Sequence, residues 1–175
     1  MRADRPSDEH EADSRVTLVT GRFQVVPSAY LIFRRTIEEG DQVLLMLRAG
    51  TGYMDGHWAT VAGHVEAGES CAAAAVREAR EEVGVDVEVR DLRPVCCMHR
   101  TAGDGQVINE RADFFFETRV WTGQPRLLEP DRAAALAWFG LGSLPTPVVP
   151  HEHSVLGNLM NGRVPAILTY GFVDA

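Results

Sequence analysis

Three carboxylates occupy positions where a helix would bring them together. Glu78, Glu81 and Glu82 are spaced i, i+3 and i+4, so on a helix their side chains share one stripe of the surface. Like charges at this spacing repel by roughly 0.2–0.5 kcal/mol per pair. A hard divalent cation such as Mg²⁺, which prefers carboxylate and water oxygens, would relieve that repulsion. The alternative is a solvated acidic face neutralised by Arg77 and Arg80, which is the usual meaning of a charge run.

The segment around these glutamates has the features of a helix with defined ends. Ser70 is a good N-cap, because its hydroxyl can accept a hydrogen bond from a free amide of the first turn. Gly84 suits the position after the helix, where a left-handed backbone costs glycine little. Four successive alanines have the highest helix propensity. An apolar stripe would pack on the rest of the protein and consists of Ala72, Ala75, Val76, Ala79 and Val83.

The full spacing of this segment resembles the Nudix box. The shared pattern is Gly63, five residues, Glu69, seven residues, Arg77-Glu78, two residues, Glu81-Glu82, one residue, Gly84 and Val85. A chance match in a chain of this length has odds of about 10⁻⁷ to 10⁻⁶. The chain departs from the family in two places. Ala79 replaces a larger aliphatic residue, and Val61-Ala62 replaces the common Pro-Gly before the box glycine.

The resemblance implies both a fold and a reaction. The fold would be α/β, an α/β/α sandwich around a mixed β-sheet, and the reaction would be cleavage of a diphosphate bond in a nucleoside diphosphate linked to another group X. Mg²⁺, with Mn²⁺ as a substitute, would be held by the Gly63 carbonyl, Glu78, Glu81 and Glu82. The remaining box residues would have structural roles, and these are Glu69, Arg77 and Gly84.

Three glutamates are candidates for the general base. Glu81 or Glu82 could accept a proton from an adjacent metal-bound water. Glu129 is the third, because it follows Pro125 by four residues, a spacing similar to that of the loop glutamate in MutT-like members. A solvated loop acid is the alternative interpretation of Glu129.

Candidate substrate contacts lie on predicted loops and strand ends. Arg48 precedes Gly63 by fifteen residues, where MutT-like proteins also carry an arginine near the triphosphate. Tyr53, Asp55 and His57 belong to a glycine-rich loop over residues 49–57, and loops on rigid scaffolds often carry binding residues. Residues that flank a polar loop over 101–109 could line a nucleoside pocket, and these are His99, Arg100, Glu110 and Arg111. His151 and His153 are interpreted as surface residues.

The rest of the chain predicts strands around two helices. Residues 1–15 are polar without hydrophobic periodicity and predict a disordered tail, and residues 16–175 predict one domain. A second helix is expected over 151–161, with Gly162 after its end. Residues 129–135 are left as loop or a short helical turn. Strands are expected over 30–35, 42–48, 58–61, 85–90, 92–100, 112–120 and 136–139.

Composition limits the class of partner. The 175 residues carry a net charge of −8, which disfavours a binder of nucleic acid polymers, because such proteins need a basic surface. Three cysteines give neither a disulfide framework nor a zinc motif, and adjacent Cys96 and Cys97 predict reduced thiols in a strand. No apolar leader or run of about 20 apolar residues is present, so we expect no membrane span and a cytoplasmic location. Either a monomer or a homodimer is compatible with these features.

The leading functional hypothesis is a Mg²⁺-dependent nucleoside triphosphate pyrophosphohydrolase of the MutT-like type. The alternatives within the family are hydrolysis of ADP-ribose, a sugar nucleotide or dihydroneopterin triphosphate. An alternative of another class is a catalytically idle module that binds nucleotide as a sensor. The complete carboxylate set disfavours the sensor, because clustered like charges destabilise the fold and a module that only binds nucleotide does not need them.

Overall fold

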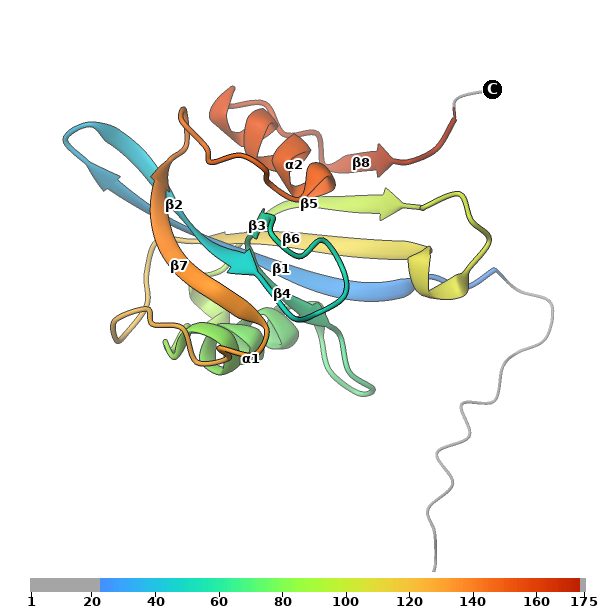
Figure 1. Ribbon diagram of the computed structural model, residues 1–175, viewed down its shortest axis with the longest axis horizontal. Helices are drawn as coiled ribbons and strands as arrows, with labels where there is room; N and C mark the ends of the chain where they lie inside the picture. Colours follow the sequence, from blue (N-terminus) through green and yellow to red (C-terminus); the bar gives the residue numbers. More distant parts are fainter. Residues whose placement is uncertain (1–22, 174–175) are drawn as a thin grey trace, which may run out of the picture.

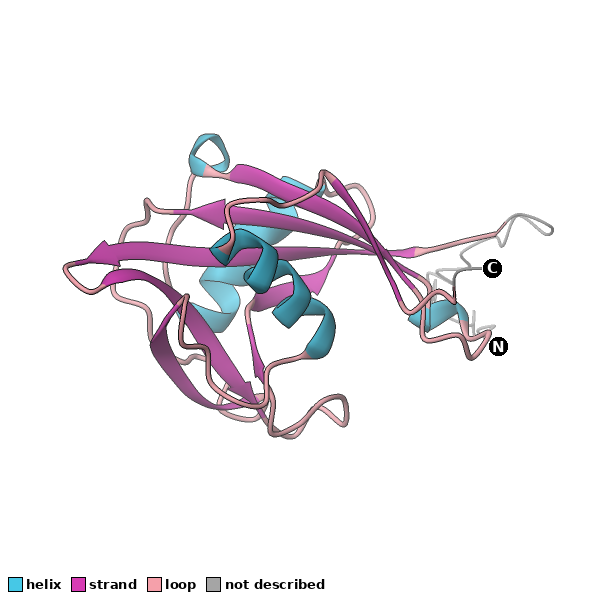
Figure 2. Ribbon diagram, turned by 90° about the horizontal axis from the view of Figure 1, so that it is seen from above, coloured by secondary structure: helices cyan, strands magenta, loops and turns pink. Residues whose placement is uncertain are grey.

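The computed structural model describes residues 23–173 and shows a mixed β-sheet with a helix on each face (Figures 1 and 2). The predicted tail over residues 1–15 lies outside the described residues. Strands are β1 Val26–Ile37, β2 Gly40–Arg48, β3 Trp58–Ala59, β4 Val61–His64, β5 Arg93–Arg100, β6 Arg111–Thr118, β7 Ala133–Gly140 and β8 Ile167–Tyr170. Helices are α1 Cys71–Val83 and α2 Pro150–Met160, and short 3₁₀ helices cover Val89–Asp91 and Val107–Asn109.

The long strand β1 divides the sheet into two parts. The strand order is β3-β2-β1-β6-β5-β8, with β4 added to β1 and β7 added to β2. The first half of β1 pairs with β4, from Ser28 opposite His64 to Leu31 opposite Val61. Its second half pairs with β2, from Arg34 opposite Val43 onward. The β1–β6 and β5–β8 pairs are parallel and the other pairs are antiparallel, so the sheet is mixed and the predicted α/β/α sandwich is confirmed.

Alternating side chains of β1 supply two cores. Leu31 and Phe33 pack with α1 on one face, whereas Tyr30 and Ile32 pack with α2 on the other. Burial on both faces explains why the strand reads as a continuous apolar run instead of alternating with polar residues. The sheet therefore separates an α1 layer from an α2 layer, and this separation places the two walls of the site described below.

The ends of α1 follow the sequence prediction. The Ser70 hydroxyl accepts a hydrogen bond from the Ala73 amide at 3.1 Å, and Gly84 adopts a left-handed backbone with φ 67°. The Gly84 amide donates to the Arg80 carbonyl at 3.2 Å and the Val85 amide to the Ala79 carbonyl at 3.4 Å, which satisfies groups that the helix end would leave unpaired. The side that packs on the sheet consists of small or branched apolar residues, Ala74, Ala75, Ala79 and Val83, beside the partly buried carboxylate of Glu78.

Several predicted boundaries were wrong. The segment 85–90 is not a strand: it forms one isolated bridge, between Asp86 and Thr122, and then a 3₁₀ helix. Its alternation arises because Val85 and Val87 are buried over the core without a neighbouring strand to extend the pairing. Strand β7 takes in residues 133–135, which the sequence left as loop or turn, and β8 was not predicted.

Two compositional predictions can be compared with the described residues. Cys96 and Cys97 lie in β5, and the cysteines of the structure, which include Cys71, are free thiols. Within residues 23–173, no helix has the length and apolar content to cross a membrane.

Candidate active site

The box glycine lies on the edge strand β4, directly against a glutamate of α1. An ideal Cβ added at Gly63 would lie 1.7 Å from Oε1 of Glu78 and 2.1 Å from its carboxyl carbon. Any side chain at position 63 would thus displace the carboxylate. The glycine is required here for close approach and not for a left-handed backbone, since Gly63 is absent from the positive-φ residues.

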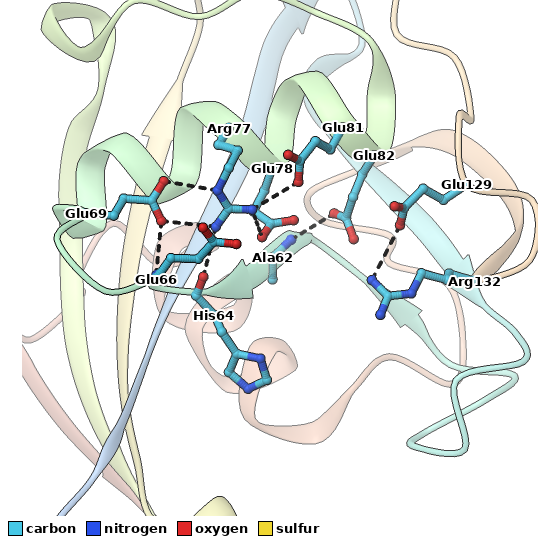
Figure 3. A network of polar contacts seen from close by, with 10 residues as sticks. All are labelled: Ala62, His64, Glu66, Glu69, Arg77, Glu78, Glu81, Glu82, Glu129 and Arg132. Atoms are coloured by element: carbon cyan, nitrogen blue, oxygen red, sulfur yellow. Dashed lines mark hydrogen bonds and ion pairs between the residues drawn. The ribbon is translucent and has the colours of Figure 1, made fainter. Parts of the chain in front are cut away.

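Arg77 ties the loop after β4 to the exposed side of α1 (Figure 3). Its Nε donates to Oε1 of Glu69 at 3.0 Å, and its Nη1 donates to Glu78 at 2.6 Å and to Glu81 at 3.0 Å. Its Nη2 also donates to the backbone carbonyl of His64 at 2.9 Å. Charge-assisted bonds to Glu69 raise the pKa of the guanidinium further above its ordinary value. One cation therefore organises a cluster that would otherwise repel itself.

Two of the box carboxylates are held where ionisation is costly. Burial, and after it the charge of Glu78, raise the pKa of Glu82 to about 8 against the opposing effect of a hydrogen bond from the Ala62 amide at 3.0 Å. Burial also raises the pKa of Glu78, while Arg77 opposes that shift. A cation placed beside these groups would favour their charged forms.

The carboxylates do not form a preassembled metal cage in residues 23–173. No three His, Cys, Asp or Glu side chains of the described chain converge closely enough to hold an ion. The guanidinium of Arg77 bonds both Glu78 and Glu81, so it takes up oxygens that a cation would need. The donor set nevertheless suits Mg²⁺, because it combines carboxylate oxygens with the backbone of Gly63 against Glu78.

Glu129 reaches the same site from a different segment. The loop that carries it is fixed to the end of α1, because the Arg126 amide donates to the Val83 carbonyl at 3.0 Å and the Leu128 amide donates to the Glu82 carbonyl at 3.0 Å. Nη1 of Arg132 lies 3.6 Å from Oε2 of Glu129 (Figure 3). That oxygen is buried and accepts no hydrogen bond within the described part of the chain.

These groups line one pocket of about 670 Å³. Nine of the residues that the sequence singled out meet there: Arg48, Tyr53, Gly63, Glu78, Glu81, Glu82, Arg100, Arg111 and Glu129. Arg77 also lines the pocket, whereas Glu69 and Gly84 support it from outside its lining. The carboxylates occupy the wall formed by α1 and β4, and the opposite wall comes from β1, β5, β6 and the start of α2.

Four predicted substrate contacts do not line this pocket, namely Asp55, His57, His99 and Glu110. His57 has its Nδ1 buried without a hydrogen-bond partner among residues 23–173. His99 lies between Phe23 and Phe172, with ring centroids at 6.3 Å and 4.6 Å. Strand alternation explains the position of His99, because its side chain points to the face opposite its neighbour Arg100, which does line the pocket.

Arg48 and Tyr53 shape the loop over residues 49–57. Nε of Arg48 donates to the Tyr53 carbonyl at 2.9 Å, and its Nη2 donates to the Thr51 hydroxyl at 3.1 Å. The guanidinium carbon also lies 5.5 Å from the centroid of the Tyr53 ring. Arg48 is therefore held at the pocket wall without a carboxylate partner among the described residues.

The pocket floor contains buried polar groups that sequence reasoning missed. His151 was interpreted as a surface residue, but it is 3% exposed and its Nε2 lies 3.2 Å from the Tyr30 hydroxyl. Burial lowers the pKa of His151 to about 3. Oε2 of Glu152 accepts hydrogen bonds from the Thr60 amide and hydroxyl at 2.6 and 2.9 Å. Only Pro150 at the helix start gave a signal, and it marked the helix but not which side chains face inward.

Comparison with known proteins agrees with this geometry. The family profile described as the NUDIX domain matches residues 27–159. The chain is 27% identical over 128 residues to the uncharacterized Nudix hydrolase YvcI of Bacillus subtilis, covering 73% of this chain and 77% of that protein. It is 30% identical over 125 residues to the NAD-capped RNA hydrolase NudC of Pseudomonas aeruginosa, covering 71% of this chain but only 40% of that protein.

Solved structures show the same likeness. The MutT Nudix hydrolase of Burkholderia pseudomallei superposes with a TM-score of 0.65 at 27% identity, covering 77% of this chain and 97% of that one. The family profile covers the strands and both helices that form the pocket. With the box residues assembled on β4 and α1, the chain belongs to the Nudix family and is a hydrolase of phosphorus-containing acid anhydrides.

Proposed function

We propose that the protein is a Mg²⁺-dependent nucleoside triphosphate pyrophosphohydrolase of the MutT-like type. The observation that carries this proposal is a single pocket in which glutamates outnumber arginines along α1, while Arg100 and Arg111 lie on the other wall. A polyphosphate needs both, since cations must be held near the scissile bond and guanidinium groups bind phosphate oxygens. The expected partner is a small nucleotide, and the protein would act as a monomer or homodimer.

The proposed metal ligands are Glu78, Glu81, Glu82 and the carbonyl of Gly63. When bound, Mg²⁺ or its substitute Mn²⁺ would lower the pKa of a water and neutralise phosphate charge. Arg77 keeps two of these carboxylates close to each other, because it donates hydrogen bonds to both Glu78 and Glu81. Glu69 fixes Arg77 in turn, which makes both of them positioning residues.

A proton acceptor is available on two sides of the site. Glu81 has a side chain that is 51% exposed and open to solvent, whereas Glu82, which accepts a hydrogen bond from the Ala62 amide, is suited to holding an ion. Glu129 offers an oxygen that accepts no hydrogen bond from the described residues. We therefore place the general base at Glu129 or Glu81, with Glu82 as the third candidate.

Arg48, Tyr53 and Arg111 are the proposed substrate contacts. All three line the pocket, and Arg48 carries no carboxylate partner among residues 23–173, so its charge is available to a phosphate. His57 and His99 would act on substrate only after a movement, because neither lines the pocket.

A second candidate is hydrolysis of the diphosphate in a dinucleotide. The observation that favours it is the 30% identity to NudC proteins, which are named as hydrolases of NAD-capped RNA. The volume of about 670 Å³ could accept part of such a substrate.

The experiment is product analysis with a panel of nucleoside triphosphates, ADP-ribose, sugar nucleotides, dihydroneopterin triphosphate and NAD, with Mg²⁺ and with chelator. We expect Mg²⁺-dependent release of pyrophosphate from a triphosphate. Nucleoside monophosphate from the diphosphate substrates instead would support the second candidate. Binding of nucleotide without turnover of any compound would contradict both and indicate a sensor.

Within that assay, Glu129→Gln tests Glu129 against the two candidate bases on α1. If Glu129 accepts the proton, kcat should fall by about 10²-fold. The Mg²⁺ concentration for half-maximal rate should stay unchanged. A wild-type kcat in Glu129→Gln would move the role to Glu81 or Glu82.

A further inference from the structure

A buried carboxylate joins two arginines on the wall of the pocket that faces α2. Asp113 is fully buried, and its Oδ2 accepts a hydrogen bond from Nε of Arg100 at 2.8 Å. Nε of Arg111 lies 3.8 Å from the other oxygen, Oδ1. Arg100 and Arg111 are direct cross-strand partners on β5 and β6. Two like charges opposite each other are destabilising unless a counterion lies between them, which is the part that Asp113 plays.

The same strand positions identify the face to which these groups belong. Asp113 and Phe115 are two positions apart on β6, and Arg100 and Met98 are two positions apart on β5, so each pair shares one face of the sheet. Phe115 and Met98 pack in the core beneath α2, which places Asp113 and Arg100 on that face. The carboxylates of α1 approach from the other layer across β4. The arginine pair is therefore a separate wall of the pocket, and it is not part of the box.

The two arginines are fixed to different degrees. Nη2 of Arg111 donates to the Ser28 hydroxyl at 2.6 Å, and its Nη1 donates to the Ile108 carbonyl at 3.2 Å and lies 2.8 Å from Nε2 of His64. Arg100 is 9% exposed and uses only Nε, so within residues 23–173 its Nη1 and Nη2 donate no hydrogen bond. Neither nitrogen is among the fully buried atoms that lack a partner, and Arg100 lines the pocket, so we infer that the two outer nitrogens face the cavity.

The charge of this wall is positive from the side of the cavity. Asp113 lies beneath the surface and is absent from the pocket lining, whereas Arg100 and Arg111 both belong to the lining. The one carboxylate on this side, Glu152, is occupied by Thr60, and burial raises its pKa to about 7. The neutral ring of a nucleobase could accept hydrogen bonds from Arg100 but could not offset its positive charge. A phosphate does both, because it accepts two hydrogen bonds from a guanidinium in bidentate geometry.

We propose that Arg100, supported by Arg111 and Asp113, forms a second phosphate subsite for a phosphate group outside the diphosphate bond that is cleaved. This inference rests on the proposed function and names a further feature of the substrate. The phosphate has two potential sources: the terminal group of a triphosphate chain, or a phosphate on the ribose. Arg100 is the contact residue, and Asp113 is a positioning residue that orients it.

The test is calorimetric binding with Mg²⁺, using ligands that the enzyme does not cleave. The series contains AMP, the α,β-methylene analogues of ADP and ATP, and adenosine 2′,5′- and 3′,5′-bisphosphate. If the subsite takes a terminal phosphate, the ATP analogue should bind about tenfold tighter than the ADP analogue. If it takes a ribose phosphate, one bisphosphate should exceed AMP by a similar factor.

The variants Arg100→Lys and Arg100→Gln should abolish that gain, and AMP affinity should stay within about twofold because AMP lacks the added phosphate. The loss of a tenfold gain corresponds to about 1.4 kcal/mol of binding free energy. Arg100→Lys keeps a charge beside Asp113 and serves if Arg100→Gln fails to fold. Exposed Arg90 lies outside the pocket, so Arg90→Lys is the matched control.

Three outcomes would overturn the proposal. One is an absence of any gain from an added phosphate in the wild type. Another is an equal loss for every ligand in Arg100→Lys, which would make Arg100 structural. The third is a preference between GMP and AMP that depends on Arg100, which would make it a reader of the base. Because binding is measured without turnover, a failed hydrolysis assay leaves these readouts intact.

Discussion

The two walls of the pocket are built in opposite ways. The acidic wall comes from one contiguous stretch, in which Gly63 and Glu82 are nineteen positions apart and a single helix sets the geometry. The cationic wall draws on residues from Ser28 to Glu152, brought together by β1, β5, β6 and the start of α2. Helix spacing sets the relative positions of the side chains on the acidic wall, and strand register sets those on the cationic wall.

This difference determines how each wall tolerates charge. Beside α1, one half-buried cation, Arg77, bonds three carboxylates, so the net charge there is negative and open to a metal ion. Beneath α2, one buried anion, Asp113, pairs with two arginines, so the surplus is positive. A phosphate substrate bound together with a metal ion would neutralise both, because the metal ion would offset the negative charge beside α1 and the phosphate would offset the positive charge beneath α2.

The largest expected effect is on the acidic wall. Glu81→Gln and Glu82→Gln should each lower kcat/KM by about 10²-fold or more, because each removes a proposed ligand or base. The thermal midpoint of the metal-free protein should stay the same or rise, since a carboxylate that repels its neighbours is lost. Glu88→Gln, at an exposed position outside the pocket, is the control. Wild-type rates in both variants would remove the metal assignment.

A smaller but still large effect should follow from filling the space at the box glycine. Gly63→Ala places a methyl group where Oε1 of Glu78 lies, so we expect activity to fall by tens of times and the free energy of unfolding to drop by about 1–3 kcal/mol. Gly142→Ala is the matched control, because a Cβ there meets no atom within 4 Å. Equal behaviour of the two variants in kinetics and urea unfolding would contradict the close approach.

The cationic wall should respond to pH through His151. Its folded pKa of about 3 lies below the ordinary 6.5, so between these values the unfolded chain binds the proton and stability falls as pH decreases. The wild type should lose up to about 1.4 kcal/mol per pH unit more than His151→Gln between pH 6 and pH 4. Glu152 shifts the other way in both proteins, so its contribution largely cancels. Parallel stability curves from urea unfolding would show that His151 does not titrate as the burial requires.

The sequence was most informative where function depends on local spacing. The cap at Ser70, the stop at Gly84 and the stripe of Glu78, Glu81 and Glu82 all follow from helix geometry, which needs no distant partner. It was least informative for segments whose pairing is non-local. Residues 85–90 alternate as a strand does, but no strand lies beside them, and β8 is defined by its pairing with β5.

What the sequence by itself determined is therefore the acidic wall, from Gly63 to Gly84, together with the family and its class of reaction. Only the tertiary structure decided that Glu129 reaches that wall, that His57 and His99 do not line the pocket, and that Asp113 lies beneath Arg100. The physical reason is that a helix fixes side chains three and four residues apart, whereas strand register and loop anchoring join residues that no local pattern connects.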